Sequence, residues 1–126
     1  MSVARKIMVV EDDEDQRELM RRALARQGYD VTAAADGIEA YDLALSLRPD
    51  LIITDVYMPA ADGAHLVRRV RDTTELAATP ILVTTGYGTG SAALTLSQGA
   101  DAYEPKPVDP GALLSTVRRL LSGGVD

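Results

Sequence analysis

Short runs of apolar, often β-branched residues alternate along the chain with longer segments in which apolar residues recur at helical spacing. This alternation is typical of an α/β domain built on a parallel sheet. The intervals between runs are long enough for the crossovers that parallel neighbours require. The pattern therefore predicts five strands with helices on both faces, at residues 7–10, 31–34, 51–54, 81–84 and, in a shorter run, 102–104.

Capping residues mark where the helices begin and end. Asp36 with Glu39 three positions later resembles a capping box, and Asp109 before Pro110 is an N-cap followed by the proline favoured in a first helical turn. Gly28 is expected to end the first helix. The apolar face of that first helix is predicted to comprise Leu19, Ala23 and Leu24.

One proline bears on the order of the strands. Pro105 ends the fifth run, and proline is tolerated at the edge of a sheet because it cannot donate to a central ladder. A fifth strand at the edge is what the doubly wound, flavodoxin-like order 2-1-3-4-5 requires. We therefore expect that α/β fold.

Length and composition limit the remaining choices. The 126 residues suit one domain, taken as residues 1–126 with a core of about 5–121, because two domains would each have too little core. The chain has no cysteine and one histidine, which excludes thiol chemistry, disulfides and multi-histidine metal sites.

Charge and hydropathy indicate the kind of partner. A net charge of -6 and a pI near 4.7 argue against direct nucleic-acid binding, so we expect output through another protein. No segment approaches the ~20 apolar residues of a membrane helix, and the first residues lead into a strand rather than a signal-peptide core. We expect no membrane association and a cytoplasmic location.

Acidic residues follow two of the predicted strands. Glu11 and Asp12 come directly after the first run, and Asp55 follows the third. If these strands are neighbours, their carboxyl ends place three carboxylates at one edge, where mutual repulsion favours a bound cation. Oxygen ligands without histidine or cysteine favour Mg²⁺. For Asp13, Glu14 and Asp15, a solvated first helical turn remains an alternative to ligation.

Two more polar groups fall at strand ends on the same side of the sheet. Thr84 and Thr85 end the fourth run, and Lys106 follows the fifth. A carboxylate nucleophile, a metal, an ammonium and a hydroxyl are together the groups that phosphoryl transfer requires.

These segments together resemble the receiver domain of response regulators in two-component signalling, and the resemblance spans nearly the whole chain. It is carried by the pair Glu11-Asp12, by the segment from Asp55 to Asp62-Gly63, by Thr85, and by Tyr103-Glu-Pro-Lys106-Pro107. The resemblance implies that Asp55 accepts a phosphoryl group from a phosphohistidine of a histidine kinase or phosphotransfer protein.

The resemblance also assigns the neighbouring residues. Asp12, Asp55 and the backbone carbonyl of Tyr57 would bind Mg²⁺ directly, and Glu11 would act through water. Lys106 would pair with phosphoryl oxygens. Thr85 and Tyr103 would act as a switch that repacks the face of helix four, strand five and helix five, so that a downstream protein or output domain can bind.

The sequence departs from the family pattern near the switch. The interval from Thr85 to Lys106 is one residue shorter than in a typical member, and Thr84 stays open as the alternative switch hydroxyl. Gly86 stands where alanine is expected, and Val108 where an aromatic residue is common.

Three other functions are possible for a chain with this pattern of strands and carboxylates. Phosphatases of the haloacid-dehalogenase class also use a strand-end aspartate, but they need a second aspartate two positions on, where this chain has Tyr57. A flavin-binding protein would need a phosphate-cradling loop after the first strand, where this chain is acidic. A binding module that works without phosphorylation stays open. We expect no enzymatic activity other than the chain's own phosphorylation and slow dephosphorylation.

Overall fold

The computed structural model describes residues 3–56, 63–86, 96 and 99–123. In this part of the chain, parallel strands form one sheet in the order β2-β1-β3-β4-β5. Each strand lies within one residue of its predicted range, and the predicted order is confirmed. The strands are β1 (Lys6–Val10), β2 (Asp30–Ala34), β3 (Leu51–Asp55), β4 (Ile81–Thr85) and β5 (Ala102–Pro105).

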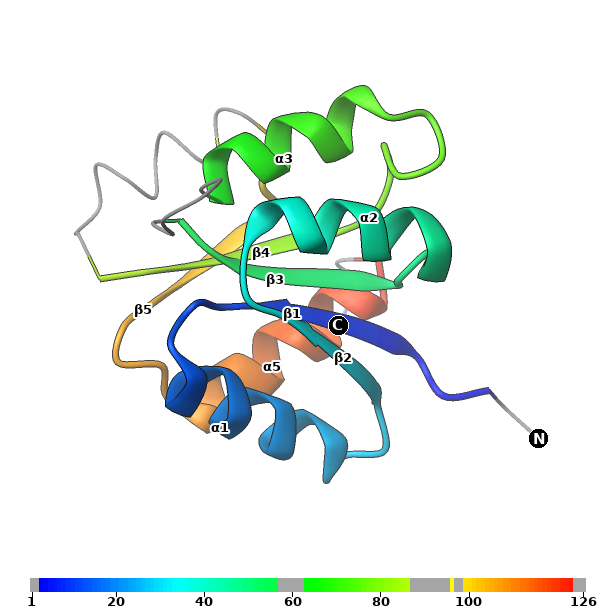
Figure 1. The fold of residues 1–126 in the computed structure, drawn as a ribbon. Coiled ribbons are helices and arrows are strands. Elements are labelled where there is room, and N and C mark those ends of the chain that lie inside the picture. Colours follow the sequence, from blue (N-terminus) through cyan, green and yellow to red (C-terminus); the bar gives the residue numbers. More distant parts are fainter. Residues whose placement is uncertain (1–2, 57–62, 87–95, 97–98, 124–126) are drawn as a thin grey trace.

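Helices cover both faces of the sheet. Helices α2 (Gly37–Leu47) and α3 (Gly63–Asp72) lie on one face, and α1 (Glu14–Ala25) and α5 (Pro110–Leu121) on the other (Figure 1). A further helix, expected between β4 and β5, falls on a segment that lies largely outside the described residues. Among the residues described, no helix is both long and apolar enough to cross a membrane.

The predicted caps are present. The side chain of Asp36 accepts a hydrogen bond from the backbone N–H of Glu39 at 2.8 Å, and that of Asp109 accepts from Ala112 N–H at 2.8 Å. Gly28 has a φ of 90°, a left-handed conformation that glycine adopts without steric cost, and it turns the chain from α1 towards β2. Local sequence chemistry therefore sets these boundaries.

Alternation along the strands divides the core in two. Successive side chains of a strand point to opposite faces of the sheet. In β1, Met8 and Val10 pack under α2 and α3, whereas Ile7 and Val9 pack under α1 and α5. In β4, Val83 belongs to the first cluster, and the same alternation runs through β3. Within one strand, odd-numbered and even-numbered residues therefore face opposite sides of the sheet, and we call this property the parity of the residue.

The inward face of α1 differs from the prediction. Leu24 is fully buried as predicted and Ala23 is partly buried, but Leu19 is 61% exposed and Met20 is buried in its place. Leu19 and Met20 are adjacent in a helix and point about 100° apart. The helical spacing alone did not show which of the two faces the sheet.

Arg71, near the end of α3, fixes where the last two strands begin. Its guanidinium donates to the carbonyls of Gly99 and Thr79 and to the carboxylate of Asp101. The same Asp101 oxygen accepts from the backbone N–H of Ile81 at 2.8 Å. The starts of β4 and β5 are thus tied together, which sets the register in which their other ends meet the site.

Two buried threonines differ in how their hydroxyls are satisfied, and this leads to a stability prediction. Thr54 donates to the carbonyl of Asp55 at 3.0 Å, but the hydroxyl of Thr84 has no hydrogen-bond partner among the described residues. A buried unpaired polar group costs free energy. We expect Thr84→Val to raise the free energy of unfolding by about 1 kcal/mol.

Thr54→Val is the matched control, because both threonines are fully buried. It removes a hydrogen bond and is expected to lower the free energy of unfolding by about 1 kcal/mol. Urea denaturation in EDTA measures both. A loss of stability in Thr84→Val as large as in Thr54→Val would contradict the prediction.

Candidate functional site

Three charged side chains meet because they continue the alternation of three strands. Glu11 follows β1, Asp55 ends β3 and Lys106 follows β5. Each has the parity of the residues that face α1 and α5. All three therefore emerge at the same edge and on the same face of the sheet.

Lys106 joins the two carboxylates. Its Nζ lies 2.8 Å from Oε1 of Glu11 and 2.9 Å from Oδ2 of Asp55. The side chains of Glu11 and Asp55 are only 1% and 8% exposed, and that of Lys106 is 19% exposed. Water screens such charges weakly, so each depends on the others for compensation.

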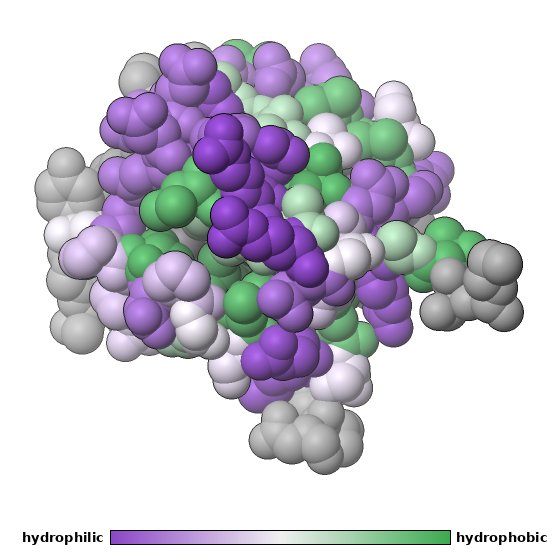
Figure 2. All heavy atoms as spheres, turned by 90° about the horizontal axis from the view of Figure 1, so that it is seen from below, coloured by the Kyte–Doolittle hydropathy of each residue, from purple (hydrophilic) through white to green (hydrophobic). Residues whose placement is uncertain are grey.

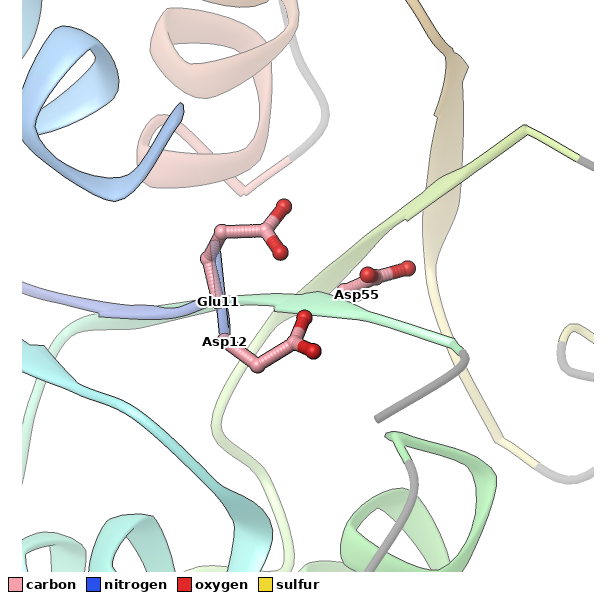
Figure 3. A group of neighbouring side chains, drawn as sticks. All are labelled: Glu11, Asp12 and Asp55. Carbon is pink, nitrogen blue, oxygen red and sulfur yellow. The ribbon is translucent and has the colours of Figure 1, made fainter. Parts of the chain in front are cut away.

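Asp12 completes an acidic group at this edge. One carboxylate oxygen from each of Glu11, Asp12 and Asp55 lies within 4.8 Å of the other two. The carboxylates of Glu11 and Asp12, at the end of β1, extend towards the side on which Asp55 lies at the end of β3 (Figure 3). Asp12 is exposed, and all three line an open cavity of about 510 Å³ together with Asp13, Gln16, Gly86 and Lys106.

The electrostatics of the site follow from burial and proximity. Burial raises the pKa of Glu11, and repulsion from Asp55 adds to the rise, although the hydrogen bonds from Lys106 and from the Asp13 N–H oppose it. Burial alone would lower the pKa of Lys106, but its contacts with Glu11 and Asp55 outweigh burial and raise that pKa. Three carboxylates facing one ammonium leave about two negative charges for a cation to neutralise.

The turn between β1 and α1 is held by residues of the turn itself. Asp13 is the N-cap of α1, and its carboxylate accepts a hydrogen bond from the Gln16 N–H at 3.0 Å. The guanidinium of Arg17 donates to the backbone carbonyl of Glu11 at 2.9 Å. This contact could not be predicted from the sequence, because every residue has a backbone carbonyl that can accept a hydrogen bond.

The two residues predicted to act as a switch lie on the opposite face. Tyr103 is the register partner of Val83, which faces α2 and α3, and Thr85 lies two residues beyond Val83. Thr85 and Tyr103 therefore share that face, whereas Thr84 has the parity of the other. Thr85 is buried and Tyr103 is 39% exposed. The predicted carbonyl ligand, Tyr57, lies outside the described residues, as does most of the predicted helix four.

An apolar groove adjoins the acidic cavity. Exposed Leu19 and buried Met20 line it from α1, Pro107 and Val108 line it from the segment after β5, and Gln16 is shared with the cavity. Seen from the side of α1 and α5, hydrophilic residues cross the surface in a band with hydrophobic residues beside it (Figure 2). The acidic cavity thus continues into a partly apolar surface.

The sequence matches the family model described as the response regulator receiver domain over residues 7–118. It is 44% identical over 117 residues to the response regulator MprA of Mycobacterium sp. strain KMS, and equally to that of Mycobacterium tuberculosis strain ATCC 25177 / H37Ra. These matches cover 92% of the chain but 50% of each relative. The chain thus spans about half the length of these curated relatives.

Solved structures show the same fold. The chemotaxis response regulator CheY4 of Vibrio cholerae superposes with a TM-score of 0.88 at 35% identity, covering 93% of this chain and 98% of that one. The receiver domain of a histidine kinase from Syntrophus aciditrophicus gives a TM-score of 0.87 at 38% identity, covering 95% and 92%. With the acidic edge and Lys106 in place, the chain belongs to the response regulator receiver family.

The link through Lys106 predicts a pH-dependent loss of stability. Lys106→Met leaves two buried carboxylates without their ammonium. We expect the free energy of unfolding to fall by about 2 kcal/mol near neutral pH. This loss is smaller than is usual for a broken buried ion pair, because Lys106 is partly exposed. Without Lys106, the pKa of Glu11 rises further. A carboxyl group whose pKa is higher in the folded than in the unfolded state adds stability at pH values below its unfolded-state pKa. That contribution is lost as the pH rises through the folded-state pKa.

The deficit of Lys106→Met should therefore be large at about pH 7.5 and smaller at about pH 5, where Glu11 is increasingly protonated. Urea denaturation in EDTA at both pH values measures it. Lys6→Met is the control, because Lys6 is exposed and its ammonium lies near the carbonyl of Leu47, without a carboxylate partner among the described residues. A deficit that is the same at both pH values would contradict the prediction.

Proposed function

We propose that Asp55 accepts a phosphoryl group from a phosphohistidine on a histidine kinase or histidine phosphotransfer protein. The observation that carries this proposal is the position of the Asp55 carboxylate, which is held by Lys106 at the wall of an open cavity shared with Glu11 and Asp12. A carboxylate oxygen attacks phosphorus, the P–N bond of the phosphohistidine breaks, and the imidazole leaves and takes up a proton.

The acidic edge fits a divalent cation. Carboxylate oxygens from Glu11, Asp12 and Asp55 lie close enough together to surround one ion, and the site carries an excess of negative charge. In this proposal Asp12 and Asp55 bind Mg²⁺ directly, and Glu11 acts through water because its carboxylate is already engaged by Lys106 and the Asp13 N–H. The ion supplies charge neutralisation between the incoming phosphoryl oxygens and the carboxylates.

Lys106 and Thr85 act on the product. The ammonium of Lys106, already 2.9 Å from Asp55, is placed to pair with an oxygen of a phosphoryl group carried there. Thr85 would bind another phosphoryl oxygen. Because Tyr103 shares the face of Thr85 and is half-exposed, a shift of Thr85 leaves room for Tyr103 to pack inward. These placements favour Thr85 over Thr84 as the switch hydroxyl.

The donor protein has to cover the cavity to reach Asp55. The apolar groove around Leu19 continues the cavity wall, and an exposed apolar side chain with polar neighbours suits a protein contact. We place the donor there. The signal would pass from the face that includes β5 and α5 to a downstream protein or output domain, in the cytoplasm, without direct contact with nucleic acid.

Phosphorylation of Asp55 is directly testable. Incubation with Mg²⁺ and acetyl phosphate should add one phosphoryl group to the intact protein, and Asp55→Asn should add none, because an amide lacks the nucleophilic carboxylate. Intact mass spectrometry at a pH that preserves acyl phosphates measures both. Beryllofluoride with Mg²⁺ should likewise bind the natural protein and not Asp55→Asn.

Asp72→Asn is the matched control, since it removes an aspartate at the end of α3, away from the site, and should leave the modification intact. A chromogenic phosphate monoester should not be turned over, as expected of a protein that only phosphorylates itself. An unmodified natural protein would favour a binding module that works without phosphorylation, and sustained monoester turnover would favour a phosphatase.

Cation binding should appear as added stability. At an Mg²⁺ concentration about ten times the dissociation constant, binding to the folded state alone raises the free energy of unfolding by about 1.4 kcal/mol. We expect this gain in the natural protein, its removal by EDTA, and almost none in Asp12→Asn. Asp15→Asn, on the exposed first turn of α1 and outside the acidic group, should keep the gain. Equal gains in all three proteins would contradict the assignment.

A further inference from the structure

The first turn of α1 contains an arginine that differs from its neighbours on the same helix. Arg21 and Arg22 both form ion pairs with Glu18, the ordinary surface arrangement. The guanidinium of Arg17 instead donates to the backbone carbonyl of Glu11 at 2.9 Å, and it forms no ion pair with a carboxylate in the part of the chain that the structure describes. A fully ionised donor is thus committed to one main-chain oxygen at the edge of the site.

That carbonyl belongs to the peptide that joins Glu11 to Asp12. A peptide unit is planar, so holding its oxygen also holds the backbone nitrogen of Asp12 and limits the direction in which the Asp12 side chain leaves the chain. The backbone N–H of Glu11 donates to the carbonyl of Ala34 at 3.1 Å, and its side chain is held by Lys106. On the Asp12 side, the Asp13 N–H donates to the Glu11 carboxylate, and the contact with Arg17 holds the oxygen of the peptide itself.

Asp12 needs such an anchor more than the other two carboxylates. The carboxylates of Glu11 and Asp55 are buried and fixed by Lys106, whereas that of Asp12 is exposed. We propose that Arg17 is a positioning residue for the cation site, which it serves by fixing the Glu11–Asp12 peptide so that the Asp12 carboxylate faces Asp55. The proposal rests on the proposed cation site.

Removing the Arg17 side chain changes the Mg²⁺ affinity in opposite directions, depending on whether Arg17 acts through its charge or by positioning Asp12. A positive guanidinium near the acidic group repels a cation, so if Arg17 acted through its charge alone, Arg17→Met would bind Mg²⁺ more tightly. If Arg17 acts by positioning, the variant binds Mg²⁺ more weakly. Removal of partners that orient metal ligands commonly weakens binding about tenfold or more. We expect a dissociation constant about tenfold higher for Arg17→Met.

Isothermal titration with Mg²⁺ on the intact folded chain, without any phosphodonor, measures this. Arg21→Met is the control. It removes the same charge one turn further along α1, where Arg21 is paired with Glu18, and it should leave the Mg²⁺ affinity unchanged. Arg17→Lys, which can restore one hydrogen bond to the carbonyl, should recover part of the loss. If Arg17→Met does not fold, Arg17→Gln, whose shorter amide does not span the same distance, takes its place.

Unchanged or tighter Mg²⁺ binding in Arg17→Met would overturn the positioning role, as would an equal loss in Arg21→Met. Failure of the natural protein itself to bind Mg²⁺ would instead overturn the proposed cation site. Urea denaturation of each variant in EDTA gives the free energy of unfolding separately, so a less stable fold is not mistaken for a lower affinity.

Discussion

The ammonium of Lys106 lies between two nearly buried carboxylates that come from different strands, and the arrangement of the site depends on this contact. Glu11 and Asp55 would repel each other at the edge of the sheet, and burial disfavours the charge of each. Lys106 offsets both effects by donating to both carboxylates. About two negative charges remain at the site, one of them on Asp12, which faces solvent, so a cation entering the cavity is attracted by a net negative charge.

This contact requires the sheet to be built in one order. β1 and β3 are direct neighbours, so Glu11 and Asp55 emerge side by side. Lys106 comes from β5, two strands away from β3, and its long side chain spans β4 to reach them. The far ends of β4 and β5 are tied by Arg71 and Asp101, which means that contacts at one end of the sheet set the register at the other. The register of the parallel strands thus determines the geometry of the site.

Parity divides the chemistry of the edge into two faces. Glu11, Asp55 and Lys106 continue the alternation that faces α1 and α5, whereas Thr85 and Tyr103 lie on the face of α2 and α3. Under the proposed function, a group bound at Asp55 would act on the other face through the end of β4, where Thr84 and Thr85 have side chains of opposite parity. Because a packed core does not deform gradually, a small shift there would favour one of two packings.

The sequence alone determined the fold class, the strand order, the caps and the identity of Glu11, Asp12, Asp55 and Lys106, because these depend on local chemistry and on the rule that parallel strands end at a common edge. Only the tertiary structure decided that Met20 and not Leu19 packs inward, and that Arg17 holds the Glu11 carbonyl. Those outcomes depend on helix rotation and on acceptors of the main chain, which are identical for every residue type and so cannot be read from residue names.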